Sequence, residues 1–257
     1  MQSLKNKVVC ITGASSGIGA ACASEFAKQG CALLLGARRI DRLETLAAGL
    51  SSQYGVRVHT VKLDVTNQKE VEQIFTSLPR DWQAIDILVN NAGLTRGLTN
   101  LYEGAIQDWE EIIDTNVKGL LYVTRSVLPG MVKRNSGHVI NIGSIAGHQT
   151  YPKGNVYCAS KFAVTGLTRG LIMDLLGTAV RVSSVDPGLV ETEFSEVRFR
   201  GDKDRAAKTY AGLTPLRPED VGEIVVFCAT RPDHVNIGEV IVTPTDQASV
   251  EMVHRRA

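Results

Sequence analysis

Tyr157 and Lys161 are the residues of this sequence whose types and spacing point most directly to proton chemistry. They lie four residues apart at the start of an apolar-periodic stretch that predicts a helix over residues 157–176. Residues i and i+4 lie one turn apart on the same helix face, so the ammonium group should lie beside the phenol. A positive charge there should lower the pKa of Tyr157 below its usual value of about 10. The pair is therefore a candidate general acid/base, and a functionless exposed pair is the alternative.

A glycine-containing turn, TGASSGIG at residues 12–19, is the second chemical motif. It follows a short apolar strand predicted at residues 7–11 and precedes a helix predicted at residues 20–28. Glycines allow a tight turn and close backbone approach, and a helix N-terminus offers free N–H groups to a pyrophosphate. The spacing G-x-x-x-G-x-G differs from the common G-x-G-x-x-G fingerprint. It predicts a dinucleotide-binding turn, with a turn that binds no ligand as the alternative.

Two arginines, Arg38 and Arg39, follow the strand predicted at residues 31–37. In dinucleotide folds an acidic residue near this point binds the ribose 2′-hydroxyl of NAD, whereas arginine suits the 2′-phosphate of NADP. The sequence therefore predicts NADP(H) as the cofactor, and a solvated pair of charges is the alternative. Asp41 could weaken the preference, but its place at the start of the next helix suggests a helix cap.

Strands and helices alternate along the rest of the chain. Further strands are predicted at residues 56–63, 85–89, 137–142, 180–185 and 239–243, and helices at 40–54, 66–78 with Thr66 as N-cap, 106–128 ending at Pro129, and 218–230. This alternation predicts a single-domain α/β fold over residues 1–257, Rossmann-like and doubly wound, with a parallel sheet of about seven strands and helices on both faces. The charged, poorly periodic segment 189–216 predicts a substrate lid, and residues 244–257 a C-terminal tail.

Polar or turn-forming residues follow the carboxyl ends of six different predicted strands: Gly13, Arg38, Asp64, Asn90, Ser144 and Pro187. Ligands of such sheets bind outside this edge, so the six positions should meet along one crevice with Tyr157. Asn116 is unusual for another reason. It stands in the middle of a predicted helix, where asparagine costs stability, and this cost suggests a function.

Composition narrows the classes of function. The 257 residues are 44% hydrophobic, enough for one α/β core, and 28 Lys and Arg balance 27 Asp and Glu to a net charge of +1. Nothing in that balance points to nucleic acid or a membrane surface. The five cysteines lack C-x-x-C spacing and the five histidines form no ligand pair, so we expect reduced core thiols and no metal. We see no signal peptide or membrane span and expect a cytoplasmic protein acting on a small molecule.

These motifs together resemble the short-chain dehydrogenase/reductase family from about Lys5 to Thr243: TGASSGIG, NNAG at 90–93, Asn116, Ser144 and YCASK at 157–161. The resemblance implies hydride transfer between a nicotinamide and a secondary alcohol or carbonyl, acting on CH–OH donors. It implies that Tyr157 is the general acid/base and that Ser144 hydrogen-bonds the substrate oxygen. Lys161 would bind the nicotinamide ribose and lower the tyrosine pKa, and Asn116 would hold a water that links Lys161 to solvent.

Cofactor contacts follow from the same resemblance. They are Gly13, Ser15, Ser16, Gly17, Ile18, Gly19, Arg38, Arg39, Asp64, Val65, Asn90, Gly93, Tyr157, Lys161, Pro187, Gly188, Val190 and Thr192. Some NADP-dependent relatives carry a basic residue where this chain has Ser16. Cofactor specificity should therefore depend on Arg38 and Arg39.

The stretches 186–201 and 244–249 are similar to a narrower subgroup, the NADP-dependent 3-hydroxy acid dehydrogenases that act on serine, L-allo-threonine and 3-hydroxyisobutyrate. A carboxylate substrate needs a cation, and Arg198 and Arg200 lie on the predicted lid. They are candidate substrate ligands together with Ser144, and surface or subunit contacts are the alternative.

Three other functions are open at this point. One is a reductase of neutral ketones, aldehydes or 3-oxoacyl thioesters. A second is a catalytically silent NADP-binding regulator, against which the intact Asn116, Ser144, Tyr157 and Lys161 set argues. A third is a structural assembly protein, because the helices at 106–128 and 157–176 carry more apolar residues than one buried face needs. We interpret these helices as the subunit interface of a homodimer or homotetrameric enzyme.

Overall fold

A seven-stranded parallel sheet forms the centre of the computed structural model, which describes residues 2–256. The strand order is β3-β2-β1-β4-β5-β6-β7, with β1 at Val8–Thr12, β2 at Ala32–Ala37, β3 at Val58–Lys62, β4 at Ile87–Asn90, β5 at Gly137–Ile142, β6 at Val180–Pro187 and β7 at Glu239–Val242. Every neighbouring pair is parallel. The predicted doubly wound fold is therefore confirmed. Met1 and Ala257, which end the predicted domain and its tail, lie outside the described residues.

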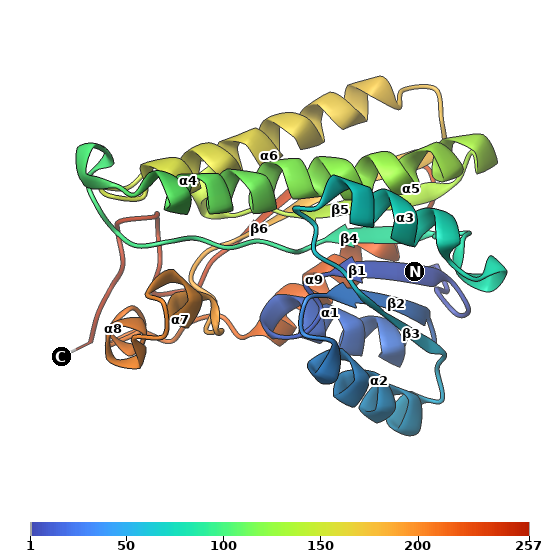
Figure 1. Cartoon of the computed structure of the whole chain (residues 1–257), viewed down its shortest axis with the longest axis horizontal. Coiled ribbons are helices and arrows are strands. Elements are labelled where there is room, and N and C mark those ends of the chain that lie inside the picture. The colour runs from blue at the N-terminus through green and yellow to red at the C-terminus, as the bar shows by residue number, and fades with distance from the viewer. Residues whose placement is uncertain (1, 257) are drawn as a thin grey trace.

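Helices cover both faces of the sheet (Figure 1). On one face lie α1 (Gly17–Lys28), α2 (Ile40–Tyr54) and α9 (Pro218–Ala229), and on the other α3 (Gln68–Ser77), α4 (Ile106–Ile113), α5 (Leu120–Arg134) and α6 (Asn155–Asp174). Each face has its own core, and β2 shows why the strands are apolar throughout. Leu33 and Leu35 pack into one core and Leu34 into the other, because side chains alternate across a strand.

Shorter helices complete the chain. They are the 3-10 helices η1 (Arg80–Trp82), η2 (Leu101–Glu103) and η4 (Ile145–Gly147), the π-helix η3 (Asp114–Gly119), and the α-helices α7 (Phe194–Arg198) and α8 (Lys203–Lys208). The segment 189–216 thus contains two helices that its weak periodicity did not reveal. Within residues 2–256 no helix has both the length and the apolar character needed to cross a bilayer.

The helix predicted at residues 106–128 differs from expectation at two points. It is interrupted by η3 around Asn116, and it continues through Pro129 to Arg134. Pro129 lies on the exposed side, where water can reach the carbonyl that loses its helical partner, and the buried Val127 and Met131 hold the helix against the sheet. The helix ends instead at Asn135, which adopts the left-handed conformation with φ of 49°.

Two predicted helix caps were also wrong. In α3 the cap is Asn67, whose side chain accepts a hydrogen bond from the Glu70 N–H at 3.3 Å. Thr66 instead donates to the Asp64 carboxylate at 2.8 Å. In α2 Asp41 lies in the first turn, inside the helix, where its charge is favourable to the helix dipole.

His138 supplies a prediction about stability against pH. It is 2% exposed in β5, its Nε2 lies 2.8 Å from Ser183 Oγ, and its Nδ1 has no partner. Burial, helped by the nearby Arg181, lowers its pKa to about 3. Between pH 6.5 and about pH 3, His138 is protonated in the unfolded chain but neutral in the folded protein. As the pH is lowered through this range, the free energy of unfolding should therefore decrease by up to about 1.4 kcal/mol per pH unit.

Replacing His138 with Gln should remove this contribution to the pH dependence of the unfolding free energy. We expect the loss of unfolding free energy between pH 7 and pH 4, measured by urea titration, to shrink by roughly 2–3 kcal/mol relative to the unmodified protein. The exposed His234→Gln is the matched control and should leave the pH dependence unchanged. An unaltered pH dependence in the His138 variant would contradict the assignment.

Candidate active site

A cavity of about 730 Å³ opens at the carboxyl edge of the sheet, where the strand order reverses between β1 and β4. Its walls come from the turns after β1 to β6, from segment 189–216 and from the C-terminal tail. Most of the predicted cofactor contacts line it: Gly13, Ser15, Ser16, Gly17, Ile18, Arg38, Arg39, Asp64, Val65, Gly93, Tyr157, Lys161, Pro187, Gly188, Val190 and Thr192. Ser144 and Arg198 line the same space.

Gly19 and Asn90 do not reach this cavity. The Asn90 amide donates to Thr124 Oγ1 and to Asn141 Oδ1, both at 2.9 Å, in the layer between the sheet and α5. Because side chains alternate along a strand, the next residue, Asn91, faces the cavity instead. A Cβ on Gly19 would lie 2.4 Å from the Asn91 amide nitrogen, so this glycine allows α1 to pack against the turn that follows β4.

The turn after β1 has the form that a dinucleotide requires. Gly13 adopts φ of 65°, and a Cβ there would lie 2.9 Å from Ala92 Cα, so only glycine fits. Ser16 precedes α1 without capping it through its side chain, which leaves the first N–H groups of the helix available at the cavity wall. Free backbone donors and the positive end of a helix dipole fit the pyrophosphate of a dinucleotide.

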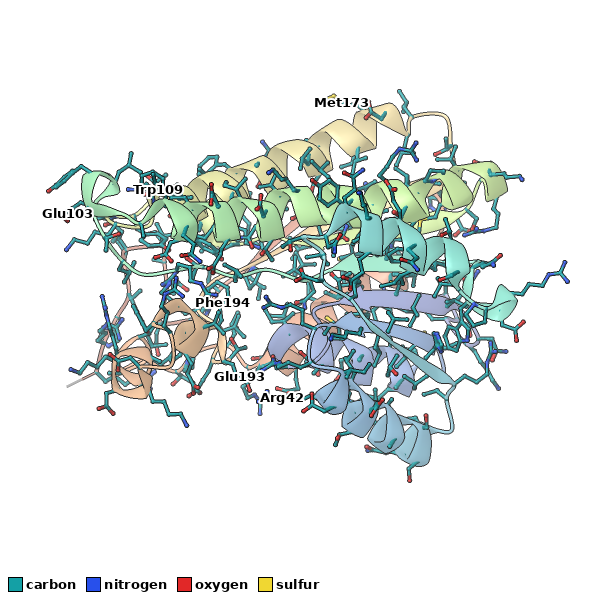
Figure 2. The ribbon with its side chains drawn as sticks, viewed as in Figure 1. Arg42, Glu103, Trp109, Met173, Glu193 and Phe194 are labelled. Carbon is teal, nitrogen blue, oxygen red and sulfur yellow. The ribbon has the colours of Figure 1, made fainter. Side chains whose placement is uncertain are left out.

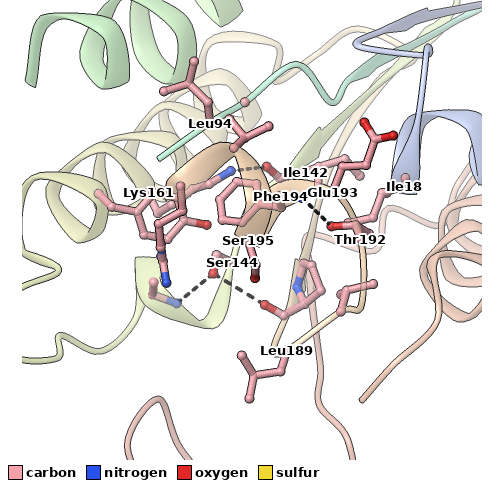
Figure 3. A pocket seen from close by; sticks show the side chains of 18 of the residues that line it. Ile18, Leu94, Ile142, Ser144, Lys161, Leu189, Thr192, Glu193, Phe194 and Ser195 are labelled. Atoms are coloured by element: carbon pink, nitrogen blue, oxygen red, sulfur yellow. Dashed lines mark hydrogen bonds between the residues drawn. The ribbon is translucent and has the colours of Figure 1, made fainter. Parts of the chain in front are cut away.

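Tyr157, Lys161 and Ser144 all line the cavity. Figure 3 shows Lys161 and Ser144 there. Ser144 Oγ accepts a hydrogen bond from the Ala146 N–H at 3.1 Å and lies 3.5 Å from the Pro187 carbonyl oxygen. Lys161 Nζ donates to the Ile142 carbonyl at 2.9 Å and lies 6.0 Å from the centre of the Tyr157 ring. The three side chains come from the turn after β5 and from the first turns of α6, so three of the four predicted catalytic residues line one cavity.

Burial governs the protonation of this set. It raises the pKa of Tyr157 well above its usual range, with Tyr151 adding to the effect and a hydrogen bond with Ser144 and the charge of Arg198 opposing it. The expected pKa below 10 is therefore not met in this structure, because burial of the phenol outweighs the contacts that lower its pKa. The Lys161 ammonium group donates to the Ile142 carbonyl. Burial also lowers the pKa of Lys161 to about 8, against the opposing charge of Asp186.

Asn116 lies outside the cavity wall, within the π-helix η3. Its Oδ1 accepts from the Leu94 N–H and its Nδ2 donates to the Leu94 carbonyl, both at 2.8 Å, and Nδ2 also donates to Ser160 Oγ at 3.0 Å. The mid-helix asparagine thus joins the loop after β4 to α6, which carries Tyr157. A π-helix is frequent at functional sites, and the proposed water at Asn116 stays a prediction.

Of the two arginines predicted to bind a substrate carboxylate, only Arg198 lines the cavity. Arg198 donates to the Tyr151 hydroxyl at 2.8 Å, and its guanidinium carbon lies 5.9, 5.7 and 5.8 Å from the ring centres of Tyr151, Tyr157 and Phe194. Its Nε is buried with no partner, and among the described residues it has no carboxylate partner. Arg200 does not line the cavity, because its side chain pairs with Asp108 on the surface.

Arg39 marks the end of the cavity nearest α2. Its Nε and one terminal nitrogen donate to Ser15 Oγ at 3.2 Å and Ser16 Oγ at 2.7 Å. Its other terminal nitrogen pairs with Glu193 at 2.8 Å, and Arg42 pairs with the second oxygen of the same carboxylate at 2.6 Å. Sequence reasoning missed Arg42 and Glu193, because nothing in their spacing links residues so distant along the chain.

Other cavity residues were also missed. Tyr151 and Phe194 form an aromatic wall beside Tyr157, and the only available signal was their place in two segments already expected to border the site. The tail contributes Gln247, Val250, Glu251, Val253 and Arg255. Gln247 Oε1 accepts a hydrogen bond from the Leu189 N–H at 2.8 Å, so it ties the tail to the start of segment 189–216.

A cluster of metal-ligand types, His148, Asp186 and Glu239, lies beyond the cavity wall, with its ligand atoms all within 4.8 Å of one another. His148 Nε2 lies 2.7 Å from Asp186, whereas Nδ1 lies 3.4 Å from Glu239. The imidazole thus uses a different nitrogen for each carboxylate. These contacts link the segment after β5 to the end of β6 and the start of β7.

Comparison with known proteins agrees with this geometry. The family model for short chain dehydrogenases matches residues 7–203. The NADP-dependent 3-hydroxy acid dehydrogenase of Escherichia coli K12 is 47% identical over 251 residues, 97% of this chain and 100% of the relative. That of Schizosaccharomyces pombe is 43% identical over 257 residues, 100% of this chain and 99% of the relative.

Solved structures of dehydrogenases also resemble this chain in sequence and fold. The closed form of serine dehydrogenase complexed with NADP+ is 47% identical, covers 97% of this chain and 100% of that chain, and has a TM-score of 0.90. An alcohol dehydrogenase from Thermococcus sibiricus complexed with 5-hydroxy-NADP is 29% identical, covers 95% of this chain and 98% of that chain, and has a TM-score of 0.83. On its sequence, its fold and the residues at its cavity, this chain belongs to the short-chain dehydrogenase family.

Proposed function

We propose that this protein is an NADP-dependent 3-hydroxy acid dehydrogenase, with L-allo-threonine, L-serine and 3-hydroxyisobutyrate as candidate substrates. The observation that carries the proposal is Arg198, a cation without a carboxylate partner among the described residues, held beside Tyr157 in the cavity. The relatives named as 3-hydroxy acid dehydrogenases support the same conclusion. Arg38 and Arg39, at the end of β2, support NADP over NAD.

The cofactor would be held by the turn after β1, by the arginines after β2 and by Lys161, and when bound it supplies or accepts the hydride. Tyr157 gives its proton to the substrate oxygen in reduction and takes one in oxidation. Its raised pKa keeps the phenol protonated near neutral pH, which suits the acid role. Ser144 lies where it can hydrogen-bond the same oxygen.

Arg198 would bind the carboxylate of the substrate. Its guanidinium group is already fixed by a hydrogen bond to the Tyr151 hydroxyl and by the rings of Tyr151, Tyr157 and Phe194, so little freedom is lost on binding. The free Nε donor is the group best placed to gain a partner. A carboxylate held there would carry its 3-hydroxyl group toward Tyr157 and Ser144. We propose that α7 and α8 act as the lid that carries Arg198 over this site.

We further propose a homodimer or homotetramer built on α4, α5 and α6, in the cytoplasm. Leu121, Phe162 and Met173 are 41%, 44% and 74% exposed on these helices, which supports an apolar contact between subunits. The five cysteines are free thiols and buried, which supports a reducing compartment. Light scattering that finds a monomer at micromolar concentration would contradict the oligomer.

A substrate panel tests the function. Purified protein should reduce NADP, followed by absorbance, when given L-allo-threonine, L-serine or 3-hydroxyisobutyrate, and should be much slower with NAD or with neutral secondary alcohols. Turnover of neutral alcohols only would favour a reductase of uncharged ketones or aldehydes. No turnover with hydroxy acids, alcohols, or the matching ketones and NADPH would favour a silent NADP-binding protein.

A further inference from the structure

Glu193 lies on the cavity wall just before α7, and its carboxylate joins segment 189–216 to α2 (Figure 2). One oxygen pairs with Arg39 at 2.8 Å and the other with Arg42 at 2.6 Å. The hydrogen bonds from Arg39 and Arg42 lower the pKa of Glu193, so it is a full anion at neutral pH. The single negative charge of Glu193 thus offsets one of the two positive charges of Arg39 and Arg42.

The position of this carboxylate matters because Arg39 is a predicted ligand of the 2′-phosphate. Arg39 donates from Nε to Ser15 and from one terminal nitrogen to Ser16, which leaves the other terminal nitrogen for an anion. Glu193 occupies that nitrogen. An incoming phosphate at the end of β2 would compete with Glu193 for this nitrogen, because two anions on one guanidinium edge repel each other.

We propose that Glu193 holds the place of the cofactor's 2′-phosphate and sets how strongly the protein binds and prefers NADP. The proposal rests on the NADP dependence proposed above. NADP has to displace the carboxylate from Arg39, whereas NAD, which lacks the phosphate, has no need to. Glu193 therefore lowers the affinity for NADP selectively and reduces the discrimination that the arginines alone would give.

The same contact couples the cofactor to the lid. Glu193 is flanked by Thr192 and Phe194, both on the cavity wall, and the Phe194 ring lies 5.7 Å from that of Tyr157. When the phosphate displaces Glu193 from Arg39, segment 189–216 loses one of its two ion pairs to residues 39–42. Arrival of NADP at one end of the cavity is thereby transmitted to the wall of the substrate site.

Direct binding measurements with Glu193→Gln test the proposal without reference to turnover. The three side chains are 40–47% exposed, so the fold should tolerate the change, and thermal unfolding of the variant checks this. The dissociation constants of NADPH and of adenosine 2′,5′-bisphosphate should fall by roughly 3- to 30-fold, as expected when one competing carboxylate with two exposed ion pairs is removed. Those of NADH and AMP should change by less than about twofold.

Glu196→Gln is the matched control, because Glu196 lies in α7 and has no ion pair among residues 2–256. It removes the same charge from the same segment and should leave all four constants unchanged. Unchanged or weaker NADPH binding by Glu193→Gln would overturn the proposal, since Glu193 would then be a passive surface partner or an aid that orients Arg39.

The double variant Arg38→Met/Arg39→Met separates failure of this inference from failure of the NADP assignment. It should weaken NADPH far more than NADH, and equal losses would overturn the cofactor assignment itself. If the double variant is selective and Glu193→Gln does not tighten NADPH, only the role of Glu193 is lost.

Discussion

Tyr157→Phe should lower kcat for oxidation of a 3-hydroxy acid by roughly 10²- to 10⁴-fold, the usual contribution of a general acid/base. The substitution removes only the hydroxyl, and the ring can keep its contacts with Phe194 and with the Arg198 guanidinium group. The cavity and the cofactor contacts should therefore survive. Turnover is measured by absorbance of reduced nicotinamide, and binding of NADPH by fluorescence titration on the same preparation.

The matched control is Tyr102→Phe, which removes a hydroxyl from a side chain that is 85% exposed on η2. It should leave kcat unchanged. Retention of more than about a tenth of the activity in Tyr157→Phe would exclude this phenol as the proton donor, because general acid/base groups contribute at least about 10²-fold. Loss of NADPH binding together with activity would point instead to a damaged site.

Arg198→Met should lower kcat/KM for 3-hydroxy acids by about 10- to 150-fold, the effect of losing a charged hydrogen bond of roughly 1.5–3 kcal/mol. The physical reason is that the substrate carboxylate would lose its cation in a partly buried, aromatic-walled cavity where water replaces it poorly. A neutral secondary alcohol of similar size should lose little, because it has no carboxylate. Steady-state kinetics on both substrates give the comparison.

Arg200→Met is the control that the chain itself offers, two residues away on the same segment. Arg200 is exposed and paired with Asp108 at the surface, where an ion pair contributes little. It should change kcat/KM for either substrate by less than about twofold. Equal losses for hydroxy acid and neutral alcohol in Arg198→Met would mean that Arg198 only positions Tyr151 and Tyr157.

Much of this site could be predicted because parallel sheets gather their strand ends. A short apolar run followed by a small or polar residue marks the carboxyl end of a strand. Because the strands run parallel, all such ends lie on one edge of the sheet. Gly13, Arg38, Asp64, Ser144 and Pro187 all appear in the cavity wall for this reason. Their convergence needs only the order of strands and helices, which hydrophobic periodicity supplies.

The sequence-based predictions that failed concern the direction in which a side chain points and the effect of burial on a pKa. Asn90 and Asn91 are chemically identical, so only the alternation of β4 decides which one faces the cavity. Arg198 and Arg200 lie in a segment of weak periodicity, where no pattern indicates orientation. The pKa of Tyr157 depends on how much water the folded cavity excludes, which its spacing from Lys161 does not reveal.

The C-terminal tail has a practical consequence for handling the protein. Val253 and Arg255 line the cavity. Arg256 pairs with Asp246 and donates its backbone N–H to the Gly212 carbonyl. The amino-terminal end lies away from the carboxyl edge of the sheet (Figure 1), and the Gln2 N–H donates to the Thr230 carbonyl. An affinity tag or surface anchor belongs before Gln2, because the same addition after Arg256 would emerge beside the cavity.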